Sequence, residues 1–176
     1  LFGSISMSSM ADIIRRANVR VTHAGLSSVS IDGARYMGGL VGYSDVGDQS
    51  NAAIDIRESS FEGSVALGCA DNSAIGGVMG ALAADMNGTN SVAVSGTGVK
   101  ATIGSATPCA TPPSTMSVGG LIGEGYGDEN DGAVNISAKD NFIIGSILVP
   151  NGQTSSIGYL VGAEKIGTSS TLIDNY

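Results

Sequence analysis

The chain has 176 residues, of which 27 are glycine and four are proline, and 42% of it is hydrophobic while only 14% is charged. This excludes a disordered tract, which needs low hydrophobicity with high net charge, and the lack of a Gly-x-y period excludes collagen. The formal net charge of −8 argues against nucleic acid and anionic membranes as partners. No apolar stretch approaches the ~20 residues of a membrane span, so we expect no transmembrane segment.

A glycine-rich motif recurs four times along the chain, at 38–42, 76–80, 119–123 and 158–162, with successive copies 38, 43 and 39 residues apart. Carrying the period backward places residues 1–3 in a partial copy. We therefore expect one domain, a fragment of a longer repeat protein, with repeats at approximately 1–37, 38–75, 76–118, 119–157 and 158–176, the last one partial. The motif residues are Gly38, Gly39, Leu40, Gly42, Gly76, Gly77, Val78, Gly80, Gly119, Gly120, Leu121, Gly123, Gly158, Leu160 and Gly162.

Two alternating apolar runs follow the glycine motif in each period. The first run covers 13–14, 54–56, 92–94, 134–136 and 172–173, and the second covers 19–21, 61–65, 99–103 and 142–144. The alternation predicts strands with Val, Ile and Phe inside and with Arg20, Asp55, Glu62, Lys100 and Asn135 outside. Each period is expected to hold three short strands. Segment 74–85 is also expected to be strand, because it contains three glycines.

Three strands in about 40 residues fit a propeller blade or one coil of a β-solenoid. Propeller blades have four strands and usually aromatic packing, whereas this chain has no Trp. The sequence therefore predicts an all-β parallel β-helix (β-solenoid) of about four coils, in which like positions stack on like. Leu40, Val78, Leu121 and Leu160 are expected to form one such column, and glycine lets the backbone approach the opposite wall.

The motif at 38–42, followed by Ile-Arg-Glu-Ser-Ser-Phe-Glu-Gly-Ser-Val at 56–65 and Ile-Gly-Gly-Val-Met-Gly at 75–80, resembles the GLUG-type glycine-rich repeat. The resemblance covers most of the chain, although only Phe61 and Phe142 keep the aromatic of that pattern and the inserts after the third strand are longer. It implies a parallel β-helix in a secreted or cell-surface, adhesin-like protein.

Two pairs of residues are candidates for covalent modification. Asn87 and Asn135 begin N-glycosylation triplets; Asn87 is expected in a turn, and Asn135 on an outer face. Cys69 and Cys109 follow the third strand in consecutive periods, where stacked coils would bring their loops together. Both a disulfide and two free thiols fit this placement.

Other motifs do not support metal or enzyme chemistry. Two cysteines with one histidine, His23, do not make a closed zinc site. The acidic turn at 128–132, with Asp45 and Asp48, lacks the spacing of a calcium loop. Asp55, Arg57, Glu58 and Glu62 fit an exposed charged strand better than a catalytic pair. The glycine motif lacks the Lys-Ser/Thr of a phosphate loop. We predict no catalytic residue, cofactor or metal.

The sequence thus predicts a non-catalytic extracellular or cell-surface segment with a structural or adhesive role, as in a filament or surface appendage. Its expected partners are neighbouring repeats of the same or an identical chain, with a glycan or a host or surface protein as ligand. The alternatives are a glycan- or protein-binding module that uses loops such as 107–113, and a polysaccharide-degrading β-helix enzyme. Close charged residues beside a groove would favour the enzyme, and a flat Ser, Thr and Asn face would favour the spacer or adhesin.

Overall fold

The computed structural model describes residues 1–7, 16–31, 35–47, 50–66, 69–105, 109, 113, 115–128, 132–149 and 155–176. These residues form 18 strands and no helix, which confirms the all-β class. It follows that no helix in the described ranges is long and apolar enough to cross a membrane.

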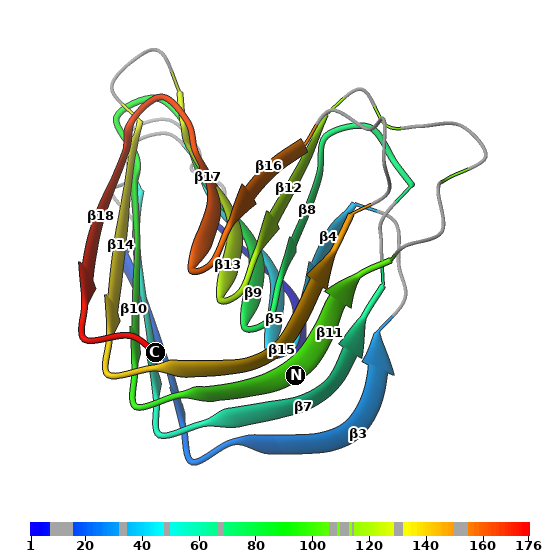
Figure 1. The fold of residues 1–176 in the computed structure, drawn as a ribbon. Helices are drawn as coiled ribbons and strands as arrows, with labels where there is room; N and C mark the ends of the chain where they lie inside the picture. The colour runs from blue at the N-terminus through cyan, green and yellow to red at the C-terminus, as the bar shows by residue number, and fades with distance from the viewer. Residues whose placement is uncertain are drawn as a thin grey trace.

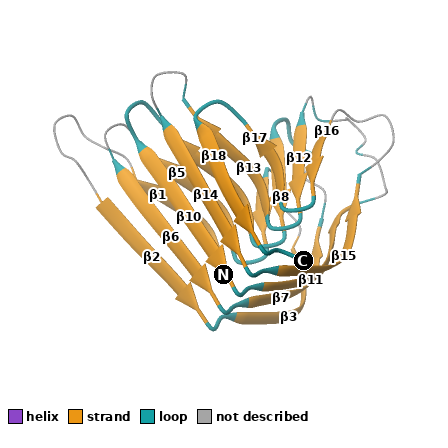
Figure 2. Cartoon of the chain, turned by 60° about the vertical axis from the view of Figure 1, so that its left-hand side comes forward, coloured by secondary structure: helices purple, strands orange, loops and turns teal. Residues whose placement is uncertain are grey.

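The strands form four parallel sheets, named here A to D (Figures 1 and 2). Sheet A contains β1 (Phe2–Met7), β5 (Val41–Val46), β9 (Met79–Ala84), β13 (Ile122–Gly127) and β17 (Val161–Glu164). Sheet B contains β2 (Arg16–Thr22), β6 (Asn51–Arg57), β10 (Thr89–Ser95), β14 (Ala133–Lys139) and β18 (Thr168–Ile173). Sheet C contains β3 (Gly25–Ile31), β7 (Ser60–Val65), β11 (Gly98–Gly104) and β15 (Phe142–Leu148). Sheet D contains β4 (Tyr36–Gly38), β8 (Ser73–Gly76), β12 (Met116–Gly119) and β16 (Ser155–Gly158).

Each strand pairs in parallel with the strand four places further along the chain. In sheet B, for example, Ile54 pairs with Val92, which lies beside Ile136 in the next strand. One repeat therefore adds one strand to every sheet, and the repeat length in the sequence is the length of one coil of chain.

Each coil has four strands rather than the expected three. The glycine motif is not one strand: it contains a two-residue turn, and Gly39 and Leu40 separate β4 from β5. Sheets D and A meet at this turn and form a V between the other two sheets (Figure 1). Segment 74–85 contains no helix, as expected, but it divides in the same way into β8, a turn and β9.

The first coil also differs from the expected assignment. Val19, Arg20 and Val21 were expected to belong to the second apolar run, but they lie in β2 and pair with residues 54–56 of the first run. The sheet C strand of this coil is β3. Its alternation is weakened by a register shift between Leu26 and Val29, which explains why the sequence pattern misses it. Residues 13–14 lie outside the described residues.

The V is narrow because its two limbs touch through glycine. A Cβ added to Gly76 would lie 2.0 Å from the Met79 carbonyl oxygen, and one added to Gly80 would lie 2.5 Å from the Met37 nitrogen. The second glycine of each motif faces sheet C, where a Cβ on Gly77 would lie 2.6 Å from Cγ1 of Val99. Real Cβ atoms do not approach other atoms this closely, so each of these positions requires glycine.

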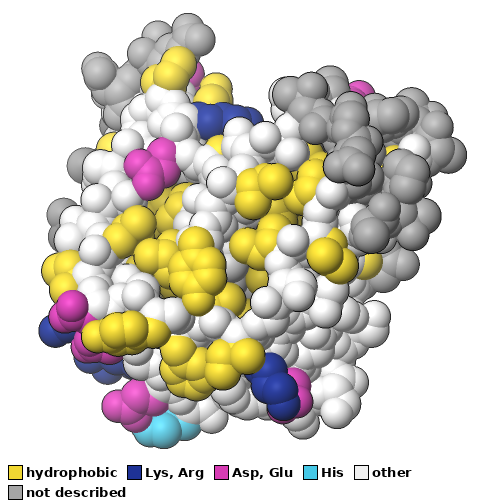
Figure 3. All heavy atoms as spheres, viewed as in Figure 1, with side chains coloured by type: hydrophobic (Ala, Val, Ile, Leu, Met, Phe, Trp, Pro, Cys, Tyr) yellow, Lys and Arg dark blue, Asp and Glu magenta, His cyan; other side chains and the backbone are white. Residues whose placement is uncertain are grey.

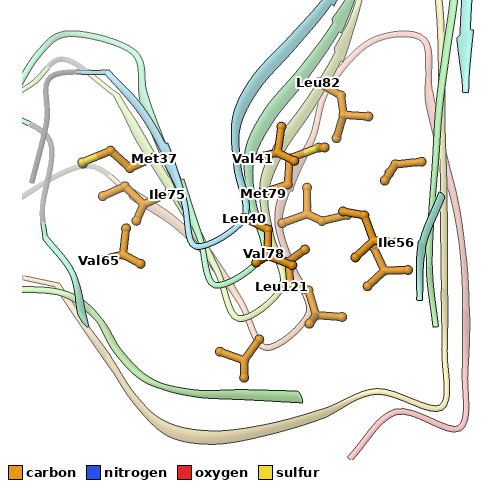
Figure 4. Close-up of a cluster of buried hydrophobic side chains, with 14 of the residues drawn as sticks. Met37, Leu40, Val41, Ile56, Val65, Ile75, Val78, Met79, Leu82 and Leu121 are labelled. Carbon is orange, nitrogen blue, oxygen red and sulfur yellow. The ribbon is translucent and has the colours of Figure 1, made fainter. Parts of the chain in front are cut away.

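The residue after the glycine pair forms the expected column. The Leu40 nitrogen donates to the Val78 carbonyl oxygen at 3.0 Å, Val78 to Leu121 at 2.8 Å, and Leu121 to Leu160 at 2.9 Å. Figure 4 shows Leu40, Val78 and Leu121 at the tip of the V, with buried side chains on both sides of it. The V therefore divides the core into one part beside sheet B and another beside sheet C.

The corner between sheets B and C also repeats in every coil. Its first residue has a positive φ each time, between 47° and 57°, at His23, Glu58, Gly96, Asp140 and Asp174. At three of these corners the next residue, Ser59, Asn141 or Asn175, caps the preceding coil through its side chain. Asn141 Oδ1 accepts from the Thr97 nitrogen at 2.9 Å, and its Nδ2 donates to the Val94 carbonyl oxygen at 2.9 Å. The corner thus fixes backbone geometry and satisfies buried polar groups in one step.

Candidate functional site

The outer face of sheet B is rich in small polar residues over its last three strands, β10, β14 and β18. Asn135 bridges its neighbours: its Nδ2 lies 3.4 Å from Ser91 Oγ, and its Oδ1 accepts from Ser169 Oγ at 2.9 Å. A shallow hollow of about 430 Å³ runs over this face and is lined by Ala, Ser, Asn and Thr, with Asp55 and Arg57 at one side. This is the kind of surface expected of a spacer or adhesin.

The acidic side chains of the charged segment at 55–62 each lie against a basic side chain. Asp55 contacts Arg57 Nε at 2.7 Å and Arg20 Nε at 3.4 Å. The hydrogen bond to Asp55 raises the pKa of Arg57. Glu58 sits at the B–C corner, 2.6 Å from Nε2 of His23. These contacts neutralise the carboxylates, as exposed structural charges commonly do.

A second groove lies on the outer face of sheet C. Its floor is made of Gly25, Ser60 and Gly98, which occupy one row across β3, β7 and β11. Glu62 and Lys100 stand beside this row, with Oε1 and Nζ 2.8 Å apart. The hollow measures about 460 Å³, within the ~300–1,000 Å³ range of small-molecule sites.

Phe142 closes one end of the groove, and its position differs from expectation. It was expected inside, in the place of Phe61, yet it is 48% exposed while Phe61 is 1% exposed. The register explains the difference: Phe61 and Ile143 both pair with Val99, whereas Phe142 pairs with Gly98. A Cβ on Gly98 would lie 2.4 Å from Cζ of Phe142, so the ring rests on a glycine backbone.

Sequence reasoning missed this groove. The signal was present in the row itself, because Gly25, Ser60 and Gly98 each directly precede an inward apolar residue, whereas Phe142 takes the same place in the fourth coil. A bulky residue in a row of small ones marks the end of a hollow on the surface. Aligning Phe142 with the buried Phe61 concealed this.

The interior of the V contains aromatic and polar side chains. The rings of Tyr36 and Tyr43 stack across it with centroids 4.4 Å apart. Burial, with Asp45 nearby, raises the pKa of Tyr43 well above its usual range. Two coils away, the buried Glu124 accepts from Ser117 Oγ at 2.8 Å and contacts Lys165 Nζ at 2.9 Å. These contacts join the two limbs of the V, which is a structural role.

The two cysteines form a disulfide in the structure, with Cα atoms 5.6 Å apart. It joins the loops between sheets C and D of two successive coils. Of the loop at 107–113, the structure describes only Cys109 and Pro113, both buried; the rest lies outside the described residues.

The two sequons lie in different settings. Asn87 is exposed in the turn between β9 and β10, with φ of 55°. Asn135 is exposed in mid-strand and is held by Ser91 and Ser169. Both asparagines face outward, as expected.

The described residues contain no group of three or more His, Cys, Asp or Glu side chains able to hold a metal ion. Of the acidic turn considered for calcium, residues 129–131 lie outside the described part, as does Asp48. Asp45 lies in β5, where burial and the charge of Asp85 raise its pKa. Burial and the neighbouring carboxylate both disfavour the ionised form that a calcium ligand needs.

No family model, curated protein or solved structure matches the chain. The resemblance to the GLUG-type repeat therefore rests on the sequence pattern alone.

Proposed function

We propose that the chain is a β-solenoid segment of an extracellular or cell-surface repeat protein, with a non-catalytic structural and adhesive role. The Ser, Thr and Asn face of sheet B carries the proposal. Over β10, β14 and β18 this face offers hydroxyl and amide groups, while β2 and β6 carry the paired charges of Arg20, Asp55 and Arg57. The pairing of every strand with the next coil adds stiffness along the axis.

The arrangement of charges favours this role over the polysaccharide-degrading alternative. A glycosidase needs two carboxyl groups facing one bond, one of them free to donate a proton. Asp55 and Glu62 lie on different sheets, and each is bound to a basic side chain. The Glu62–Lys100 pair beside a groove is the feature that the enzyme alternative would use.

The disulfide supports the extracellular location, since such bonds persist in oxidising compartments. Titration of the native, unreduced protein with a thiol reagent under denaturing conditions tests it. We expect no reactive thiol. Two reactive thiols per chain would remove this support for secretion.

Adhesion and catalysis can be tested on the same protein. Beads coated with the chain should adhere to at least one member of a panel of immobilised polysaccharides and cell-surface proteins. Beads coated with unfolded chain serve as the control. The chain should release no reducing ends or unsaturated sugars from those polysaccharides. Steady product release would overturn the non-catalytic role, and equal adhesion by the control beads would overturn the adhesive one.

We further propose that a neighbouring coil of like sequence covers the end formed by β15 to β18. Hydrophobic side chains gather on this end (Figure 3). Exposed members include Ile157, Tyr159 and Ile166, each more than half exposed. Their side chains and the unpaired strand edges would be buried by another coil. Analytical ultracentrifugation should show association that weakens when Ile157 and Ile166 are changed to Lys, and a strict monomer at high concentration would contradict this.

A further inference from the structure

The groove on sheet C combines features that an ordinary strand surface does not have. Its floor is a row of three small residues, so it is hollow where neighbouring rows carry side chains. The Phe142 ring is held at the end of this row by packing on Gly98, yet nearly half of its surface remains open to solvent. An aromatic ring that is fixed on one side and exposed on the other is a preformed platform.

The polar groups beside the platform are both accessible. The side chains of Glu62 and Lys100 are 51% and 65% exposed while they hold each other at 2.8 Å. A carboxylate offers several acceptor positions and an ammonium offers three donors, so a pair that shares one contact keeps capacity for others. Ser60 adds a hydroxyl on the floor, and it stands two residues before Glu62 in β7, on the same exposed face of the strand.

We propose that this groove binds one neutral sugar ring of a glycan, stacked on Phe142 and hydrogen-bonded through its hydroxyls to Glu62, Lys100 and Ser60. The inference rests on the adhesive part of the proposed function and names its ligand class. A sugar ring has an apolar C–H face and a rim of hydroxyls that both donate and accept. The groove presents the matching pair, an aromatic face beside a mixed donor and acceptor pair.

Other ligand classes fit the groove less well. A wholly apolar ligand would cover the Glu62–Lys100 pair without replacing its water, which is costly. An anionic ligand would meet a chain of net charge −8 and a lysine already paired with a carboxylate. The same field disfavours an acidic polysaccharide. A neutral sugar avoids both penalties.

The absence of tryptophan from the chain allows a direct test. Phe142→Trp places a single indole on the platform and should preserve stacking. Its fluorescence is then titrated with cellobiose, maltose, lactose and mannobiose, and with digalacturonate as the acidic comparison. At least one neutral disaccharide should shift or quench the emission in a saturable way. Met86→Trp, in the exposed turn between β9 and β10, is the matched control and should not respond.

Calorimetric titration with the responding disaccharide then tests the remaining residues in the natural background. Phe142→Ala should weaken binding at least tenfold, and Phe142→Tyr should retain it. Ser60→Leu should also weaken it at least tenfold, because the added side chain fills the floor while Phe142 stays in place. Met86→Ala removes an exposed apolar residue outside the groove and should bind like the natural chain.

The proposal is overturned if no neutral disaccharide changes the Phe142→Trp emission, or if Phe142→Ala and Ser60→Leu bind as tightly as the natural chain. A response to digalacturonate alone also overturns it. Beads that still adhere in any of these cases would show that the adhesive role holds and that a different surface performs it. If the folded natural chain neither adheres nor binds a sugar, both proposals are overturned together.

Discussion

The two corners that repeat in every coil impose their geometry in different ways. At the V turn, a Cβ would collide with backbone atoms, as Gly77 shows with the Gly120 oxygen at 2.3 Å. At the B–C corner the requirement is a positive φ, and a Cβ on Gly96 would find Glu58 Cγ as its nearest neighbour at 3.7 Å. Where a Cβ would collide with backbone atoms, only glycine fits. Where φ is positive but a Cβ has space, several residue types fit at a modest cost in stability.

The largest effect should come from Gly80→Ala in the V. Neither the Gly42 oxygen nor the Met37 nitrogen, 2.5 Å from the added Cβ, can move without breaking the neighbouring strand. We expect a loss of more than about 4 kcal/mol in the free energy of unfolding, or failure to fold. Gly3→Ala is the control, since Gly3 holds the same motif position in the first coil and a Cβ there meets nothing within 4 Å. The check is the urea midpoint of unfolding of each variant. Similar midpoints for the two would refute this account of the V.

The next effect belongs to the capping residue of the B–C corner. Asn141→Ala leaves the Thr97 nitrogen and the Val94 carbonyl oxygen, both now bonded to the amide, buried without a partner. We expect a loss of about 2–4 kcal/mol, because each unsatisfied group costs about 1–3 kcal/mol. Asn135→Ala, on the outer face of sheet B, should change stability by no more than about 0.5 kcal/mol. Equal losses in the free energy of unfolding at the two asparagines would mean that the corner cap does not stabilise the fold more than a surface hydrogen bond does.

A smaller effect is expected from Gly96→Ala at the same corner. Space is available, so the cost should be only that of placing an L-residue at φ of 57°, about 1 kcal/mol. Gly96→Asn should cost less, since asparagine tolerates this region better. The comparison of corners fails if Gly96→Ala destabilises the protein as much as Gly80→Ala, measured by the same urea unfolding.

The smallest expected effect concerns pH and the limb that leaves the V turn. Burial and Asp85 raise the pKa of Asp45 above its ordinary value of 3.8. The folded state therefore holds this proton more tightly than the unfolded state, and stability should fall as pH rises from about that value through the raised pKa. Asp45→Asn removes this loss. Urea unfolding between acid and neutral pH should show the variant gaining on the natural chain as pH rises; parallel curves would show that Asp45 does not contribute.

The same contrast explains what the sequence could reveal. The V turn is visible because its glycines recur, and the column through Leu40 and Leu160 follows from their spacing. The B–C corner is hidden, since His23, Glu58 and Gly96 share a φ but no chemistry. The fourth strand per coil was missed because β4 and β5 flank a turn inside what looked like one apolar run.

The candidate groove was hidden for a related reason. Inward and outward positions of a strand differ by one residue, and nothing in Phe-Ile-Ile at 142–144 shows which of the three faces the core. Only pairing with Val99 places Ile143 inside and Phe142 outside. A parallel register is set by neighbours distant in the sequence, so a local pattern does not determine it.

The coil lengths carry a consequence for how such a chain can change. The V turn and the B–C corner always contain two residues, whereas the connections from sheet C to sheet D vary, from 66–72 in one coil to 105–115 in the next. Added length is therefore confined to the two other connections of each coil. Foreign peptides grafted there should be displayed at regular intervals along one side of the molecule, with the backbone beneath them unaltered.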